Sequence, residues 1–121
     1  MKKLIALFLF SLCTVCSAGE KEEAIAGALM IAGDWLTTRD MSHRYNEGYY
    51  ETGPVVKALF GNKPSTTQVD VYFAARLLLH YALYNTDILS TNNKRIYYYI
   101  TIADHGSALA NNISIGLKLK F

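Results

Sequence analysis

Apolar residues recur at helical spacing in three stretches of the chain, which turn-forming residues separate. The first stretch, residues 24–36, is apolar on nearly every side and rich in alanine and glycine. Acidic residues precede it at positions 20, 22 and 23, and the helix dipole favours negative charge in a first turn. We therefore predict a long buried helix that begins there. We expect it to return to water through Arg39, Asp40, His43 and Arg44.

A second long helix is predicted to begin after Ser65, because Ser65-Thr66-Thr67-Gln68 has the spacing of a capping box. We expect it to run to about Tyr84. Its apolar face follows the three-and-four spacing and comprises Val69, Tyr72, Phe73, Arg76, Leu77, His80 and Leu83. A third long helix is predicted from about Lys94 to Ala110, with a buried stripe made of Ile96, Tyr99, Ile100, Ala103, Ser107 and Ala110.

The block between the first two long helices, residues 45–65, is punctuated by glycine and proline, which favour turns. Within it, residues 55–60 suit a short helix, with Pro54 at its first position and Gly61 at its C-terminus. The tail, residues 113–121, alternates apolar with small or polar residues, which is the period of a strand. The other repeated segments that a barrel needs are missing. We therefore expect a lone strand or an extended arm lying on the bundle.

These patterns predict an all-α fold, a small bundle of three long helices plus one short helix. A chain of 121 residues suits a single domain. We assign residues 19–121 to that domain and residues 113–121 to its extended tail.

The first eighteen residues have the layout of a secretory signal peptide. Two lysines follow Met1, residues 4–12 are apolar, and small residues lead to Gly19. We expect cleavage after Ala18, or alternatively after Ser17. An uncleaved anchor is the other interpretation, although the apolar run is shorter than the roughly 20 residues that a bilayer requires. The expected location is the inner membrane or the periplasm, in preference to the outer membrane.

Removal of this peptide changes the charge and the thiol content of the chain. Lys2 and Lys3 leave with it, so ten basic and ten acidic residues remain. No basic surface is evident, which argues against nucleic acid as a partner. Cys13 and Cys16 also lie in the peptide, and neither follows the small residue that lipid attachment requires. The mature domain is therefore expected to have neither a disulfide nor thiol chemistry.

Ionisable residues interrupt all three apolar stretches and predict a polar seam inside the bundle. Its expected members are Asp34, Thr38, Arg39, Glu51, Arg76, His80, Asp104 and His105. Two histidines with carboxylates are ligand types of zinc and iron sites. No helical His or Glu spacing supports such a site, so we expect no metal and no cofactor. If a metal is bound, its ligands are expected to be Asp34, Glu51, His80 and His105. Otherwise Asp34 is expected to be buried and paired with an arginine or histidine of a neighbouring helix.

Nine tyrosines are too many for the core of so small a domain. Several of them must lie at a surface. Tyrosine has an apolar ring and a polar tip, and it favours membrane interfaces and protein contacts. A solvated tyrosine cluster is the alternative interpretation.

A set of short motifs spans most of the mature chain: Asp34-Trp35-Leu36-Thr37-Thr38-Arg39, Glu51 with Pro54, Gly61 with Pro64-Ser65, Tyr72-Phe73 with His80, and Asn112 with Gly116 and Phe121. With these motifs the chain resembles small uncharacterised helical proteins of proteobacteria and their phages. The resemblance implies a membrane-associated helical domain. The chain departs from the pattern at Gly53, where asparagine is expected, and at His105, where an acid is expected.

The sequence therefore predicts an exported structural or interaction protein of the bacterial or phage-related cell envelope, associated with a membrane and without catalytic activity. Its expected partners are the membrane and either another envelope protein or a second copy of the chain. A small metal-dependent envelope hydrolase that uses Asp34, Glu51, His80 and His105 is the alternative.

Overall fold

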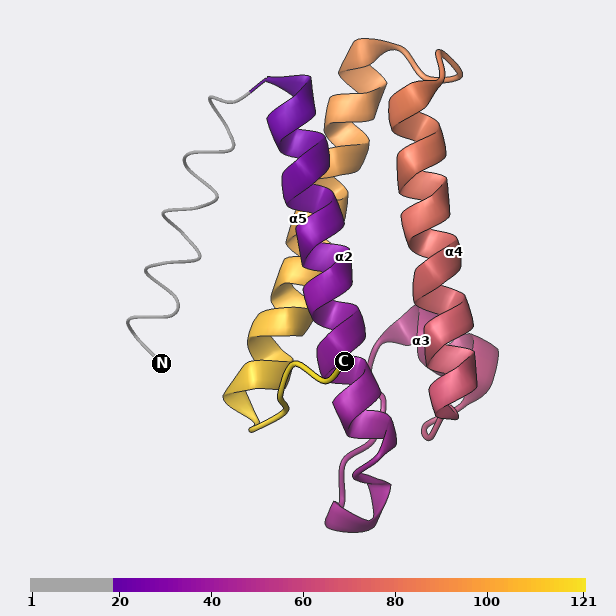
Figure 1. Ribbon diagram of the computed structural model, residues 1–121, viewed down its shortest axis with the longest axis vertical. Helices are drawn as coiled ribbons and strands as arrows, with labels where there is room; N and C mark the ends of the chain where they lie inside the picture. The colour runs from indigo at the N-terminus through magenta and orange to yellow at the C-terminus, as the bar shows by residue number, and fades with distance from the viewer. Residues whose placement is uncertain (1–18) are drawn as a thin grey trace.

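The computed structural model describes residues 19–121, and the expected signal peptide, residues 1–18, lies outside the described residues. All regular secondary structure in the described part is helical, and this part contains no strand (Figure 1). Its elements are α2 (Glu20–Ser42), the short 3₁₀ helix η1 (Tyr45–Glu47), α3 (Pro54–Phe60), α4 (Thr66–Asn85) and α5 (Thr91–Ser114). The predicted all-α bundle of three long helices and one short helix is confirmed, with η1 as an additional turn.

α2 is the central helix and packs against both α4 and α5. Small residues on α2 permit this close approach. A Cβ added at Gly27 would lie 2.7 Å from Cε1 of His80 on α4, and one added at Gly33 would lie 2.7 Å from Cδ2 of Leu109 on α5. The glycine and alanine content of residues 24–36 therefore serves helix contact on two sides.

The helix ends follow local sequence chemistry. Ser65 and Gln68 form the predicted capping box at the start of α4. Pro54 occupies the first turn of α3, and Gly61 ends that helix with a φ of 81°, a conformation that glycine adopts at little cost. At the start of α5, the side chain of Ser90 accepts a hydrogen bond from the backbone N–H of Asn93.

The apolar core is small. Its buried centre consists of Ile31, Val69 and Phe73, and the partly buried Trp35, Tyr72 and Leu77 pack against it. Trp35 stacks on Phe73 with the ring centroids 6.4 Å apart. The indole N–H of Trp35 donates to Asp70 at 2.8 Å, so that its polar atom is satisfied. Much of the remaining interior is polar.

The predicted buried stripe of α5 is wrong. Ile96 and Ile100 are 49% and 63% exposed, whereas the buried residues of α5 are Lys94, Tyr98, Thr101, Ile102, His105 and Gly106. The helix is rotated relative to its apolar periodicity because its inward face carries side chains that pair with polar groups of α2. α5 also begins three residues before the predicted start and continues to Ser114.

Two further expectations need correction. Asp40 does not return α2 to water: it is 6% exposed, and it accepts hydrogen bonds from Arg44 and from the backbone N–H of Lys118. In the tail, residues 113 and 114 belong to α5, and residues 117–121 form no strand. The backbone N–H of Lys120 donates to the carbonyl of Leu36 at 3.3 Å, so the tail lies along the C-terminal half of α2.

Within residues 19–121, no helix combines the length and the apolar character that crossing a membrane requires.

The two glycines of α2 provide a matched test of this packing. Alanine removes a helix-propensity cost of about 1 kcal/mol at either position. At Gly27 the new methyl group meets the buried His80 ring, which a hydrogen bond to Ala24 holds in place. At Gly33 it meets the movable end of a leucine side chain. We expect Gly27→Ala to lower the free energy of unfolding by about 1–3 kcal/mol and Gly33→Ala to leave it unchanged or raise it. Urea unfolding of both variants checks this, and equal effects would contradict it.

Candidate functional site

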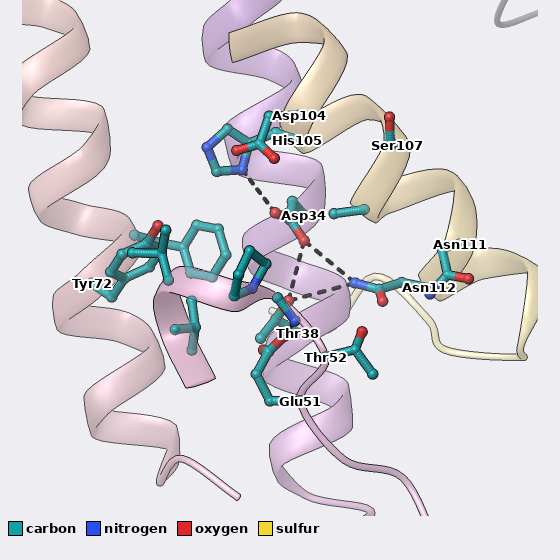
Figure 2. A pocket seen from close by; sticks show the side chains of 16 residues that line it. Asp34, Thr38, Glu51, Thr52, Tyr72, Asp104, His105, Ser107, Asn111 and Asn112 are labelled. Carbon is teal, nitrogen blue, oxygen red and sulfur yellow. Dashed lines mark hydrogen bonds and ion pairs between the residues drawn. The ribbon is translucent and has the colours of Figure 1, made fainter. Parts of the chain in front are cut away.

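A cleft of about 330 Å³ opens beside α2, between α5 and the segment that leads into α3 (Figure 2). Both polar and apolar residues line it. The polar lining comprises Asp34, Thr38, Glu51, Thr52, Asp104, Ser107, Asn111 and Asn112, with His105 and Tyr72 at its edges. Pro54, Val55, Val56 and Phe73 supply apolar lining. A concave site of this size with converging polar groups is the first place to look for function.

Asp34 lies at the centre of the polar lining. It projects from the middle of α2 and is only 7% exposed. Its Oδ2 lies 2.8 Å from Nδ1 of His105, and its Oδ1 accepts hydrogen bonds from Thr38 at 3.2 Å and Asn112 at 3.3 Å (Figure 2). Burial raises the pKa of Asp34 because the charged form loses hydration, and the bonds from His105 and Thr38 oppose that shift only in part. The expected pairing of Asp34 with a basic residue of a neighbouring helix is therefore present.

His105 connects all three long helices. It is 3% exposed, and its Nε2 lies 3.4 Å from a guanidinium nitrogen of Arg76 on α4. A guanidinium only donates hydrogen bonds, so Nε2 is the acceptor and the Nδ1–H of His105 donates to Asp34. Both ring nitrogens are therefore occupied within the protein. His105 is placed as a bridge between an acid and an arginine and has no nitrogen left to act as a general base.

Asn112 extends this network by two turns of α5. Its Nδ2 donates to Thr37 at 2.9 Å as well as to Asp34. Asn112 was not expected in the seam, because an asparagine near the end of a helix typically marks its termination. Asn112 lies seven residues after His105 and therefore on the same face of the helix, and this spacing could have indicated that it belongs to the seam.

Glu51 borders the same cleft from the segment before α3. It is 8% exposed, and its Oε1 accepts a hydrogen bond from the backbone N–H of Gly53 at 2.5 Å. Burial raises the pKa of Glu51, and the negative charge of Asp34 raises it further. The cleft thus contains two carboxyl groups that both resist ionisation.

The structure brings most of the predicted seam together. Asp34, Thr38, Glu51, Asp104 and His105 line the cleft, and Arg76 reaches it through His105. The remaining two residues lie elsewhere: Arg39 pairs with Asp70 at 3.4 Å, and His80 bonds to the backbone carbonyl of Ala24 at 2.7 Å. Burial lowers the pKa of His80, which favours its neutral form.

The four residues of the alternative metal site are not assembled. His80 is held against α2 at Ala24, nearly three helical turns before Asp34. Across residues 19–121, no group of three or more His, Cys, Asp or Glu side chains is placed to hold a metal ion.

Another buried acid, at the N-terminal end of α2, was missed from the sequence. Glu23 is fully buried and accepts hydrogen bonds from Arg95 at 2.6 Å and from the hydroxyl of Tyr99 at 2.6 Å. The bond from Arg95, and then that from Tyr99, lower the pKa of Glu23 against the opposing effect of burial. The charged lead-in at residues 20–23 gave no sign of this role, because such runs usually face water.

Comparison with known protein families, curated proteins and solved structures found no match. The resemblance described from the sequence motifs therefore stays a prediction.

The Asp34 network predicts a stability loss that its neighbour Asp104 does not share. Asp34→Asn replaces an acceptor by an amide that has to place an N–H against the donors of His105 or Asn112. We expect a loss of about 1–3 kcal/mol in the free energy of unfolding at neutral pH. Asp104→Asn is the matched control, because Asp104 is exposed beside the same cleft and its loss is expected to change stability little. Chemical unfolding measures both, and an unchanged Asp34→Asn variant would show that the network does not hold the helices.

The buried acids Glu23 and Asp34 are expected to affect stability with opposite pH dependences. The folded-state pKa of Glu23 is lowered from 4.5, so its stabilising contribution is present above that value and is lost as the pH falls. The folded-state pKa of Asp34 is raised from 3.8, so its contribution is greatest below that value and decreases as the pH rises. Between about pH 3 and pH 7, the deficit of Glu23→Gln relative to wild type should grow, whereas that of Asp34→Asn should shrink. Urea titrations at several pH values check this, and two deficits that change in the same direction would contradict it.

Proposed function

We propose that the chain is an exported, membrane-associated interaction protein of the cell envelope and that it has no catalytic activity. The observation that carries this proposal is the distribution of its side chains. Among residues 19–121, ten polar or charged residues are buried, whereas seventeen large apolar residues are exposed. Scattered apolar residues are normal on a protein surface, but contiguous apolar faces mark sites of interaction.

The clearest such face is on α4. Five residues whose side chains point away from the bundle form a continuous stripe, which we call the α4 stripe: Val71, Ala75, Leu78, Leu79 and Ala82. Leu78 alone is 68% exposed. The two charged residues of this helix, Asp70 and Arg76, are instead turned toward the bundle, where Asp70 pairs with Arg39 and Arg76 with His105. The α4 stripe therefore carries no charge, which suits a protein or lipid contact better than water.

The other two long helices follow the same arrangement. α2 exposes Ile25 and Leu29 while it buries Glu23, and α5 exposes Ile96 and Ile100 while it buries Lys94. The exposed apolar faces therefore occur around much of the bundle. Another envelope protein or a second copy of the chain is the partner that this surface suits, at the inner membrane or in the periplasm.

The contacts among the cleft residues support a role without catalysis. Its most buried groups are occupied by one another: both oxygens of Asp34 and both ring nitrogens of His105 have partners within the protein. A nucleophile or general base needs a lone pair that faces the substrate. The network instead has the properties of a structural element that orients three helices.

Fractionation of cells that express the full chain tests the proposal. Wild-type protein should be recovered with the membranes, and Leu78→Glu should reduce the membrane-bound share severalfold because it places a charge in the α4 stripe. Thr67→Glu, on the exposed first turn of the same helix, is the control and should behave as wild type. Both variants should unfold like wild type. Recovery of the wild type in the soluble periplasmic fraction without detergent would refute membrane association.

A cysteine variant distinguishes the two partners. The part of the chain after residue 18 contains no cysteine, so Leu78→Cys introduces a single thiol there. A second copy packed stripe to stripe should give a disulfide-linked dimer under mild oxidation, whereas Thr67→Cys should not. A monomer that stays with the membranes would instead favour a different envelope protein.

A further inference from the structure

One end of the bundle carries basic and apolar side chains together. The C-terminal tail lies at this end, beside the end of α2, and η1 and α3 lie at the same end (Figure 1). Six exposed apolar or basic residues of α5's last turn and the tail make up what we call the tail patch: Ile113, Ile115, Lys118, Leu119, Lys120 and Phe121. Phe121 is 90% exposed and Leu119 is 53% exposed. None of these apolar side chains belongs to the core.

The tail patch is held in place by its backbone, which leaves its side chains free. The carbonyl of Gly116 accepts a hydrogen bond from Arg44 at 3.0 Å, and that of Ile115 accepts one from Tyr49 at 3.0 Å. The N–H of Lys118 donates to Asp40 at 2.9 Å, and Leu117 is buried. The tail is therefore anchored along α2, so the exposed side chains present a surface and do not form a loose end.

The charge at this end is unbalanced. Its acids are paired or buried: Asp40 and Glu47 share Arg44, which leaves one negative charge among the three, and Glu51 is buried at the cleft. Four exposed lysines make no ion pair within residues 19–121, namely Lys57, Lys63, Lys118 and Lys120. The opposite end of the bundle exposes the acids Glu22 and Asp87 together with Lys21, so it has no comparable excess of lysines. The field of the protein therefore directs the tail end toward a negative surface.

We propose that the tail patch docks on the surface of a membrane that contains anionic phospholipids. Lysine side chains near such a surface are attracted to the headgroups, and their long stems let the charge stay in the headgroup layer. Phe121 and Leu119 then enter the boundary between headgroups and acyl chains, where an apolar ring is favoured. Two kinds of interaction thus act together, which is what reversible membrane attachment needs. This inference rests on the proposed membrane association and adds a lipid contact at the tail patch to the partner contact of the α4 stripe.

An acidic protein is the competing occupant, and the observations favour lipid. An acidic protein surface matches lysines but offers no place for a phenyl ring that has no pocket or groove of its own. A lipid surface accepts both, and it does not require the shape complementarity that a protein interface requires.

Vesicle sedimentation of the exported protein, purified from cells that express the full chain, tests the proposal. The probes are vesicles of phosphatidylcholine alone and vesicles that contain equal parts of phosphatidylglycerol and phosphatidylcholine. We expect binding to the anionic vesicles, weakened by salt, and much weaker binding to the neutral ones. Equal binding to both would overturn the proposal, as would loss of vesicle binding with full retention on immobilised polyglutamate, which would assign the patch to an acidic protein.

Matched variants locate the contact. Lys120→Ala should lower the partition coefficient about fivefold, whereas Lys21→Ala, an exposed lysine at the opposite end, should have little effect. Phe121→Ser should weaken binding, whereas Ile88→Ser, which changes a 77% exposed side chain between α4 and α5, should not. Effects of the same size in the control variants would show that the tail patch is not the contact.

The outcome of the vesicle experiment can be distinguished from that of the cell fractionation that tests the proposed function. Protein that remains with cell membranes but does not bind the anionic vesicles refutes the tail patch and leaves a protein partner as the means of attachment. Protein that binds the vesicles through the tail patch but is recovered in the soluble periplasmic fraction upholds this surface and refutes membrane association in the cell.

Discussion

The buried pair between Asp34 and His105 is the interaction on which the arrangement of the three long helices depends. An acid that is 7% exposed needs partners, because an unpaired charge in the interior costs several kcal/mol. Asp34 finds His105 on α5, and His105 in turn finds Arg76 on α4, so that one chain of contacts specifies how both helices meet α2. Burial raises the pKa of Asp34, so its carboxyl group is costly to ionise, and the contacts of this carboxyl group fix how α5 is oriented on α2.

This polar interior determines what is left for the surface. The centre of the apolar core has only three fully buried side chains, Ile31, Val69 and Phe73, because the inward faces of all three long helices are shared with polar groups. Leucine and isoleucine side chains then occupy outward positions on α2, α4 and α5. The exposed apolar faces thus follow from the buried network. Contact with a partner would remove these apolar side chains from water.

Local chemistry in the sequence was enough to predict the helices but not the orientation of each one. The capping box at Ser65, the proline and glycine around α3 and the burial of Asp34 all depend on near neighbours in the chain, and these were correct. The predicted buried face of α5 was wrong, because the apolar residues that recur at helical spacing along this helix face outward in the structure. Glu23 and Asn112 were missed for a related reason: their partners lie more than seventy residues away in the sequence. Helical spacing shows which residues share a face, but not which distant residue that face meets.

The two proposed contact surfaces lie in different directions, which bears on how one small domain is used. The α4 stripe runs along the side of the bundle, whereas the tail patch lies at the end where α2 finishes (Figure 1). A protein that rests on a lipid surface by its tail patch therefore keeps the side of α4 free for a partner standing on the same membrane. The buried network connects the two surfaces, since Asp34 on α2 reaches Arg76 on α4 through His105, while Asp40, less than two turns further along α2, holds the backbone of the tail at Lys118. In the proposed arrangement, one helix thus fixes the directions of both contact surfaces.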